Sequence, residues 1–211
     1  MKVLIATGVF PPESGGPATY SQELLHGLPE HGIEASVLPF REARKYPKIV
    51  RHAVYFFLVL SRGRKVDIIY AQDPVSVGLP AMLASFVLRK KFVLKVVGDY
   101  AWEQSTNRFG YTETIEYFQT DEENGILSKI FRYVERRVAR AACMIIVPSK
   151  YLGGIVAQWG VPKEKIKVVY NGITPHEVGL KQVIRGLLRF KGQLIISAGR
   201  LVPWGARCCL C

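Results

Sequence analysis

The stretch that decides the fold is KVLIATGVFPPESGGPATY, residues 2–20. Its first part, Lys2 to Ala6, is a short apolar run that Thr7 and Gly8 close, which is typical of a buried strand. Prolines and paired glycines follow, and Pro17 stands where the first turn of a helix begins. A strand, a glycine-rich loop and a helix in this order predict the first unit of an α/β domain.

The same alternation continues along the chain. Further strands are predicted at 35–38, 67–70, 92–97, 143–147, 166–170 and 194–198. Further helices are predicted at 46–60, 75–88, 127–141 and 150–159. Residues 98–123 show little periodicity, and we expect an irregular segment there. Because crossovers between parallel strands need a covering element, the pattern predicts a Rossmann-like parallel sheet flanked by helices, with ligands at the carboxyl ends of the strands.

Composition limits the kind of protein. The 211 residues, 49% of them hydrophobic, suffice for one domain and the beginning of a second. The longest apolar run, 53–60, falls short of the roughly 18 residues that cross a bilayer. The N-terminus is too short in apolar residues for a signal peptide, so we expect a cytoplasmic location. A net charge of +12 favours an anionic partner, whether a membrane surface, a nucleic acid or a phosphorylated substrate.

Several site classes are not expected. Cys143 lies in an apolar run, and Cys208, Cys209 and Cys211 crowd the end of the chain, so their spacing supports neither a disulfide framework nor a metal site. Nucleic-acid binding is not expected, because no reading motif and no interleaving of aromatic with basic residues is present. The four histidines, including His52, have no partner in reach by sequence and are interpreted as surface or helix-end residues.

Gly15 and Gly16 form the candidate ligand loop. Backbone amides directly before a helix can approach an anion closely, and the helix dipole favours negative charge there. An ordinary strand-to-helix turn remains the alternative. The loop lacks the third glycine of GxGxxG and the Gly-Lys of a P-loop, so neither a dinucleotide nor ATP is expected as a cofactor.

Four segments in order resemble family 4 glycosyltransferases of the GT-B type. They are FPPESGGPATY (10–20), VPSKYL (147–152), VVYNGI (168–173) and SAGRLVPW (197–204). The resemblance implies an N-terminal acceptor-side domain at 1–173, followed at 174–211 by the linker and first strand of a truncated donor-binding domain. It also implies retaining hexosyl transfer from a nucleotide sugar, which is a substrate rather than a cofactor, to a glycan or a lipid-linked acceptor, without a metal.

The resemblance also assigns residues. Gly15 and Gly16 would approach the donor diphosphate and the acceptor, Asn171 begins the interdomain linker, and Arg200 belongs to the side that contacts donor phosphates. After Trp204 the family continues with Lys-Gly, whereas this chain reads GARCCLC. We therefore expect a frameshift or an assembly error there, and little or no transferase activity from this chain alone.

Asp99 is the candidate catalytic residue. It follows the strand at 92–97 and stands beside Tyr100 and Trp102, which are candidate substrate-binding residues. It is expected to bind an acceptor hydroxyl or to assist proton transfer, since a carboxylate near apolar rings can have a raised pKa. The alternative is an aspartate that caps the loop. The sequence departs from the family at Val97, where many members carry a histidine.

Basic residues on both sides of the apolar run 53–60, with Arg41 and Arg44 among those before it, suggest a membrane-facing helix. Such a helix can lie in a bilayer interface, where a lipid-linked acceptor is found. A core helix with a solvated basic end is the alternative. The arginines at 132, 136 and 140 would extend the same surface. A second hypothesis for the whole chain is therefore a non-catalytic module that binds an anionic glycolipid or a membrane surface.

Overall fold

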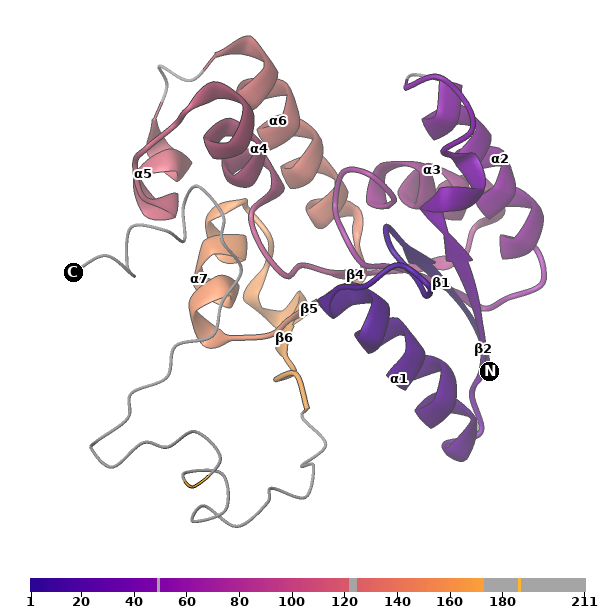
Figure 1. Ribbon diagram of the computed structural model, residues 1–211. Helices are drawn as coiled ribbons and strands as arrows, with labels where there is room; N and C mark the ends of the chain where they lie inside the picture. The colour runs from indigo at the N-terminus through magenta and orange to yellow at the C-terminus, as the bar shows by residue number, and fades with distance from the viewer. Residues whose placement is uncertain (49, 122–124, 173–185, 187–211) are drawn as a thin grey trace. The chain divides into compact units, whose positions relative to one another are not determined.

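Six parallel strands form a single sheet in the order β2-β1-β3-β4-β5-β6 (Figure 1). The computed structural model describes residues 1–48, 50–121, 125–172 and 186. The strands are β1 (Lys2–Thr7), β2 (Glu34–Pro39), β3 (Ile68–Ala71), β4 (Lys91–Lys95), β5 (Met144–Val147) and β6 (Ile166–Val168). The predicted Rossmann-like parallel sheet is confirmed.

Helices separate the strands and cover both faces of the sheet. They are α1 (Gly16–Glu30), α2 (Val50–Gly63), α3 (Gly78–Leu88), α4 (Tyr100–Phe109), α5 (Ile115–Thr120), α6 (Ile126–Ala141) and α7 (Lys150–Gln158). Short 3₁₀ turns lie at η1 (Phe40–Ala43) and η2 (Lys163–Lys165). Helix α1 packs on one face, whereas α2, α3, α6 and α7 contribute to the larger apolar cluster on the other face.

Alternate residues of each strand feed these two clusters. In β1, Leu4 and Ala6 belong to the larger cluster, while Val3 and Ile5 face α1. This alternation follows from the two-residue repeat of a strand and explains why the central strands are apolar on both faces. The larger cluster also buries Tyr55, whose hydroxyl donates to the Leu38 carbonyl at 2.7 Å.

The segment expected to be irregular contains two helices. Helix α4 begins at Asp99, whose carboxylate accepts the Trp102 amide at 2.7 Å, and ends at Gly110, which has a φ of 69°. Thr114 caps α5 in the same way. The expectation of an irregular 98–123 was wrong because these helices are short and are defined by their caps, which apolar periodicity does not report. The strand expected at 194–198 lies outside the described residues.

Helix α6 buries only part of the expected face: Val138 is buried, and Phe131 and Val134 are partly buried. Leu127 and Ala141, which the periodicity placed on the core side, are exposed, whereas Ser128 and Glu135 are buried. Contacts within the chain divide it at Tyr170–Asn171, close to the expected boundary at residue 173. The domain assignment itself stays a prediction. Within the described residues, no helix has both the length and the apolar content to cross a membrane.

Candidate functional site

The strand order reverses between β1 and β3, and this position marks the candidate site. The chain leaves β1 for β2 on one side and then returns to β3 on the other side. The loops that follow β1 and β3 therefore separate, and open α/β sheets bind ligands at such a point. Here it lies between the loop that contains Gly15 and Gly16 and the turn at Asp73.

Two arginines fix the glycine loop from outside. Arg41 donates to the carbonyls of Phe10 and Pro11 at 3.0 and 2.5 Å, and Arg44 donates to the Gly8 carbonyl at 3.0 Å. Arg44 also forms an ion pair with Glu13. From sequence, both arginines were grouped with a membrane-facing basic cluster, but here they hold the loop. The loop has few backbone hydrogen bonds of its own, so its carbonyls are free to accept hydrogen bonds from the two arginines.

The glycines stand at the start of α1. Gly15 is the N-cap residue with a φ of 149°, a conformation that glycine adopts readily and other residues rarely do. Gly16 is exposed, and no atom lies within 4 Å of the position that a Cβ would take. No side chain caps this helix terminus. Because Pro17 has no N–H and the Ala18 amide donates to the Gly15 carbonyl at 2.9 Å, the Gly16 amide is the group of this terminus that suits an anion or a polar ligand atom.

Asp73 supplies a carboxylate at the same point. One of its oxygens accepts the backbone amides of Val75 and Ser76, both at 2.7 Å, and a Cβ on Gly8 would lie 3.7 Å from its other oxygen. Burial raises the pKa of Asp73, while the hydrogen bonds from Ser76 and Val75 lower it. The carboxylate is thus held rigidly beside the first residues of the glycine loop.

Two further side chains converge on Ser76. The Tyr100 hydroxyl hydrogen-bonds the Ser76 side chain, and its ring meets Phe131 edge-on with centroids 5.6 Å apart. His52 reaches the Ser76 backbone from α2. Burial raises the pKa of Tyr100 and lowers that of His52. His52, interpreted from sequence as a surface or helix-end residue without a partner, is half-buried, and its ring lies 5.1 Å from that of Phe40.

Asp99 lies at the end of β4 but is turned inward. It is 2% exposed, and its second carboxylate oxygen accepts the Gln119 side-chain amide at 2.7 Å. Together with its bond to the Trp102 amide, this geometry favours the alternative of a capping aspartate. Burial raises the pKa of Asp99, and its hydrogen bonds lower it. A direct catalytic role for Asp99 stays a prediction.

Glu135 of α6 is the partner that sequence reasoning missed. It is 1% exposed and accepts the amides of Tyr100 and Ala101 at 2.9 and 3.4 Å. Burial and the neighbouring charge of Asp99 raise its pKa well above the usual value, and the two carboxyl groups hydrogen-bond each other. Two buried carboxyls in contact share a proton, since both cannot ionise cheaply. The pair anchors the start of α4 and thereby positions Tyr100.

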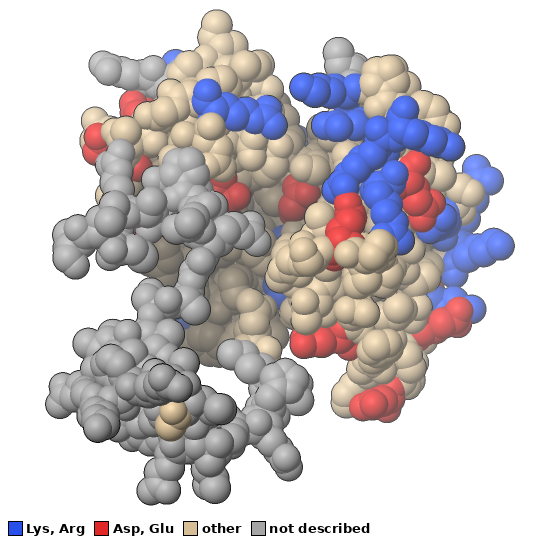
Figure 2. Space-filling model, in the orientation of Figure 1, with Lys and Arg blue, Asp and Glu red and all other residues tan. Residues whose placement is uncertain are grey.

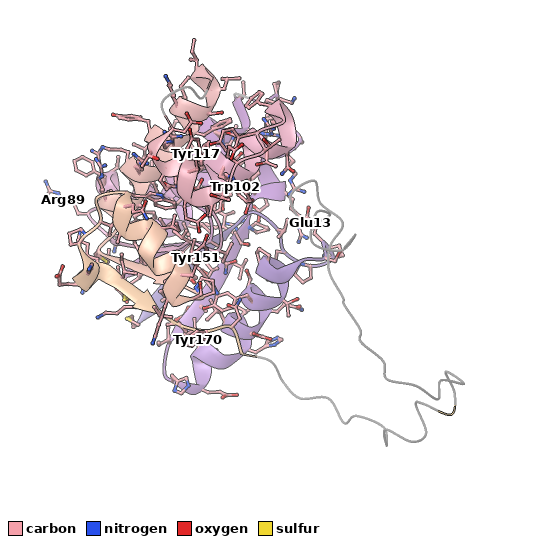
Figure 3. The ribbon with its side chains drawn as sticks, turned by 90° about the vertical axis from the view of Figure 1, so that its left-hand side faces the viewer. Glu13, Arg89, Trp102, Tyr117, Tyr151 and Tyr170 are labelled. Atoms are coloured by element: carbon pink, nitrogen blue, oxygen red, sulfur yellow. The ribbon has the colours of Figure 1, made fainter. Side chains whose placement is uncertain are left out.

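The other predicted site residues are more dispersed. Trp102 lies on α4 and donates its indole N–H to the Glu113 carbonyl at 3.0 Å (Figure 3). Asn171 is exposed and belongs to the second part of the chain, and Arg200 lies outside the described residues. A cavity of about 550 Å³ lies between α4 and the start of α6, beside Phe109 and Tyr111, rather than at the strand ends.

Sequence reasoning did not assign a role to Asp73, Ser76, Glu135 or Lys95. Asp73 does follow a predicted strand. That position indicates a ligand site only when the strand order is known, because ligands bind where the order reverses. Lys95 carries no such signal, because it looks like a surface lysine. In the structure it is almost fully buried against the Tyr20 ring, and burial lowers its pKa to about 8.

The family model for Glycosyltransferase Family 4 matches residues 14–177, most of the chain. The chain belongs to this family. The match begins in the glycine loop and includes the carboxyl ends of β2, β3, β4, β5 and β6. Among curated protein sequences, none matches the chain.

Solved structures show the same GT-B fold at low sequence identity. Anabaena HepE in complex with UDP has 18% identity and a TM-score of 0.51, with 90% of this chain and 49% of that chain covered. The UDP-GlcNAc 2-epimerase of Methanocaldococcus jannaschii has 14% identity, a TM-score of 0.51, and 80% and 45% covered. A putative UDP-N-acetylglucosamine 2-epimerase of Listeria monocytogenes has 13% identity, a TM-score of 0.52, and 78% and 43% covered. This chain thus spans about half of each protein.

Proposed function

We propose that the chain is the acceptor-side half of a retaining glycosyltransferase that moves a hexosyl group from a nucleotide sugar to a glycan or a lipid-linked acceptor. The observation that carries the proposal is the position of the glycine loop. In a chain of this family, the loop stands at the switch point of the sheet, with an uncapped helix terminus and the Asp73 carboxylate beside it.

The residues divide the work by their chemistry. The amides at Gly15 and Gly16 bind phosphate or sugar oxygens that approach the start of α1. The Asp73 carboxylate and the Tyr100 hydroxyl suit sugar hydroxyl groups, which both donate and accept hydrogen bonds. We assign Asp99 to positioning, because its oxygens already hold the amide of Trp102 and the side chain of Gln119. Asn171 keeps its proposed role as a substrate-binding residue at the entry to the interdomain linker, and Arg200 keeps its proposed role on the donor side.

The donor is inferred from relatives. Structures of Anabaena HepE hold UDP and UDP-glucose, and the Neisseria meningitidis epimerase binds UDP-GlcNAc. A nucleotide sugar is accordingly the proposed substrate of the complete enzyme, with no resident metal or cofactor. Because this chain spans about half of such proteins, we propose that it has little activity alone. The proposed location is cytoplasmic and peripheral to the inner face of the membrane.

Two forms of the protein test this function. The first is the 211-residue chain, and the second is a longer form in which Trp204 is followed by Lys-Gly and a donor-binding domain. The longer form is expected to release nucleoside diphosphate from one member of a nucleotide-sugar panel, faster with acceptor present, whereas the shorter form does not. If the longer form released nucleoside diphosphate from no member of the panel, the proposal would be wrong.

A matched pair of variants in the longer form tests the loop. Gly16→Val and Gly27→Val both place new atoms where nothing lies within 4 Å of the Cβ, on the same helix. Only Gly16 stands at the proposed ligand position. We expect Gly16→Val to lower turnover by about 100-fold, because a displaced substrate reacts poorly. Gly27→Val is expected to retain turnover, and equal losses would show that the effect is structural.

A non-catalytic module that binds an anionic glycolipid or membrane surface is the second candidate. The exposed basic residues around α2 and α3 favour it. It predicts lipid binding without nucleotide-sugar turnover in either form of the chain. Turnover by the longer form decides between the two candidates.

A further inference from the structure

Helix α3 is apolar all round and yet lies at the surface. It contains no charged residue between Gly78 and Leu88. Ala81 and Ala84 face the core, but Phe86 is 85% exposed, Val87 60% and Leu83 46%. A surface helix of a globular protein normally turns a polar face to water, so the outer face of α3 is unusual.

Helix α2 enlarges this face. Phe57, in the middle of α2, is 63% exposed, and Val50 at its start is also exposed. The two helices pack against each other closely, since a Cβ on Gly63 would lie 2.8 Å from the Leu88 side chain. Five side chains, namely Val50, Phe57, Leu83, Phe86 and Val87, define what we call the α2–α3 face.

Cations border the α2–α3 face at both ends of its helices. Exposed lysines and arginines precede α2 and follow both α2 and α3: Lys45, Lys48, Arg64, Lys65, Arg89 and Lys91. Figure 2 shows Lys and Arg side chains gathered over the part of the molecule where Figure 1 places α2. Figure 3 shows Arg89 on the opposite side of the view from Glu13 of the glycine loop.

Five basic residues in the region do not belong to this border, and two of them, Lys90 and Arg51 over the Phe40 ring, are only partly exposed. Arg41 and Arg44 hold the glycine loop, and Arg62 forms an ion pair with Glu42 at 2.6 Å. The remaining cations have exposed side chains next to exposed apolar side chains. That combination matches an anionic bilayer, which offers hydrocarbon and phosphate at adjacent depths. The 14 residues of α2 extend about 21 Å, so the cations at its two ends contact well-separated headgroups.

We propose that the α2–α3 face docks the protein onto a bilayer that contains anionic phospholipid. Phe57, Phe86 and Val87 enter the interface between headgroups and acyl chains, and the cations bind lipid phosphates. Only the use of this surface for a lipid-linked acceptor rests on the proposed function. The chain that leads into α2 carries Arg41 and Arg44, which link the glycine loop to the segment before α2.

Vesicle binding tests the proposal without any transferase activity. The complete 211-residue chain is mixed with vesicles of phosphatidylcholine alone, or of phosphatidylcholine and phosphatidylglycerol in equal parts, and sedimented. Binding is expected only to the anionic vesicles and is expected to weaken with added salt. Absence of binding to anionic vesicles at low salt overturns the proposal and leaves the glycosyltransferase function untouched.

Paired variants locate the contact. Phe86→Gln with Val87→Gln is expected to weaken partitioning by at least about tenfold, since two apolar side chains stay in water. Tyr117→Gln removes a side chain that is 57% exposed on α5, away from this face, and is expected to change nothing (Figure 3). Thermal melting of each variant checks that the fold is retained.

Charge reversals at two places on the surface distinguish the effect of where the cations lie from the effect of net charge. Arg89→Glu with Lys91→Glu is expected to weaken binding roughly 20-fold or more, at about fivefold for each basic residue removed. Lys150→Glu with Lys163→Glu changes the net charge equally on exposed residues near α7 and is expected to have a far smaller effect. Equal effects of the two pairs would reveal unspecific attraction and overturn the proposal. The proposal would also be overturned if the chain did not bind vesicles but self-associated, and if Phe86→Gln abolished that self-association.

Discussion

The layer formed by α2 and α3 and the lobe formed by α4, α5 and α6 use basic residues in opposite ways. In the lobe, the α6 arginines bind backbone carbonyls: Arg132 those of Phe118 and Asp121, and Arg136 that of Gln119. Arg140 likewise donates to the Trp159 carbonyl at 2.6 Å. In the layer, the cations beyond the helix ends point to solvent. The expectation that the arginine stripe extends a membrane surface was therefore wrong.

The difference lies in the available acceptors. Helix α5 is short and ends beside α6, so its last carbonyls lack partners within the helix and carry partial negative charge. Guanidinium groups of α6 satisfy them. At the C-terminal ends of α2 and α3, the backbone amides of Lys65 and Lys90 already donate to helix carbonyls, and exposed cations such as Arg89 remain in water. A basic residue thus becomes structural where unpaired carbonyls lie within reach.

Loss of the buried acid should damage the lobe most. Glu135→Ala leaves the amides of Tyr100 and Ala101 without acceptors, and we expect the free energy of unfolding to fall by about 3 kcal/mol or more. Urea denaturation followed by circular dichroism measures it. Glu164→Ala, at an exposed position, is the control and is expected to stay within about 0.5 kcal/mol. A comparable cost for both changes would mean that Glu135 is not the anchor of α4.

Arginines on one helix should differ in importance. Arg132→Met keeps the apolar stem but removes the hydrogen bonds to the Phe118 and Asp121 carbonyls, at a cost of about 2 kcal/mol. Arg137→Met, at an exposed position on α6, is expected to change stability by less than about 0.5 kcal/mol. The same urea titrations compare them. If Arg137 matters as much as Arg132, helix propensity rather than the carbonyl contacts explains the arginines.

Stability of the lobe should depend on pH. The pKa of Glu135 in the folded chain lies well above its usual value of 4.5. Between these two pKa values, the folded chain holds a proton that the unfolded chain has released. Stability is therefore full below about pH 4 and decreases as the pH rises toward the raised pKa, by up to about 1.4 kcal/mol for each pH unit. Urea midpoints between about pH 5 and pH 8 measure this slope. Glu135→Gln should flatten it, and an unchanged slope would assign it to other groups.

The smallest effect is expected on the α2–α3 face. Phe86→Gln exchanges an 85% exposed ring for a polar side chain of good helix propensity, so stability should change by less than about 0.5 kcal/mol. Thermal melts of the chain without lipid provide the measurement. A loss of several kcal/mol would show that Phe86 packs against protein, and the face would then not be free to dock.

Much of the fold was predictable from the sequence. Sequence patterns located the strands that the structure describes and five of its helices, namely α1, α2, α3, α6 and α7, because a two-residue or 3.6-residue apolar repeat reflects burial directly. They failed for α4 and α5, whose ends depend on Asp99 and Thr114 as caps. They failed again on the buried face of α6, where buried Glu135 and partly buried Arg132 break the rule that charges face water.

The candidate site was predictable only in outline. Gly15, Gly16 and Asp99 were found because they follow predicted strands. Asp73 and Ser76 lie in the turn after β3, whereas His52 comes from α2, and only the strand order brings these two segments to one edge of the sheet. Periodicity cannot supply that order, because the apolar pattern of a strand does not show which other strand it pairs with.

By itself, the sequence determined the glycosyltransferase family, the alternation of strands and helices, and a glycine-rich loop directly before a helix. Only the tertiary structure decided what the charged residues do. Arg41 and Arg44 hold the loop, Asp99 and Glu135 share a buried position, and Arg89 remains in water. The physical reason is that a charge acts through the partners within hydrogen-bonding distance, and those partners are set by folding rather than by neighbours in sequence.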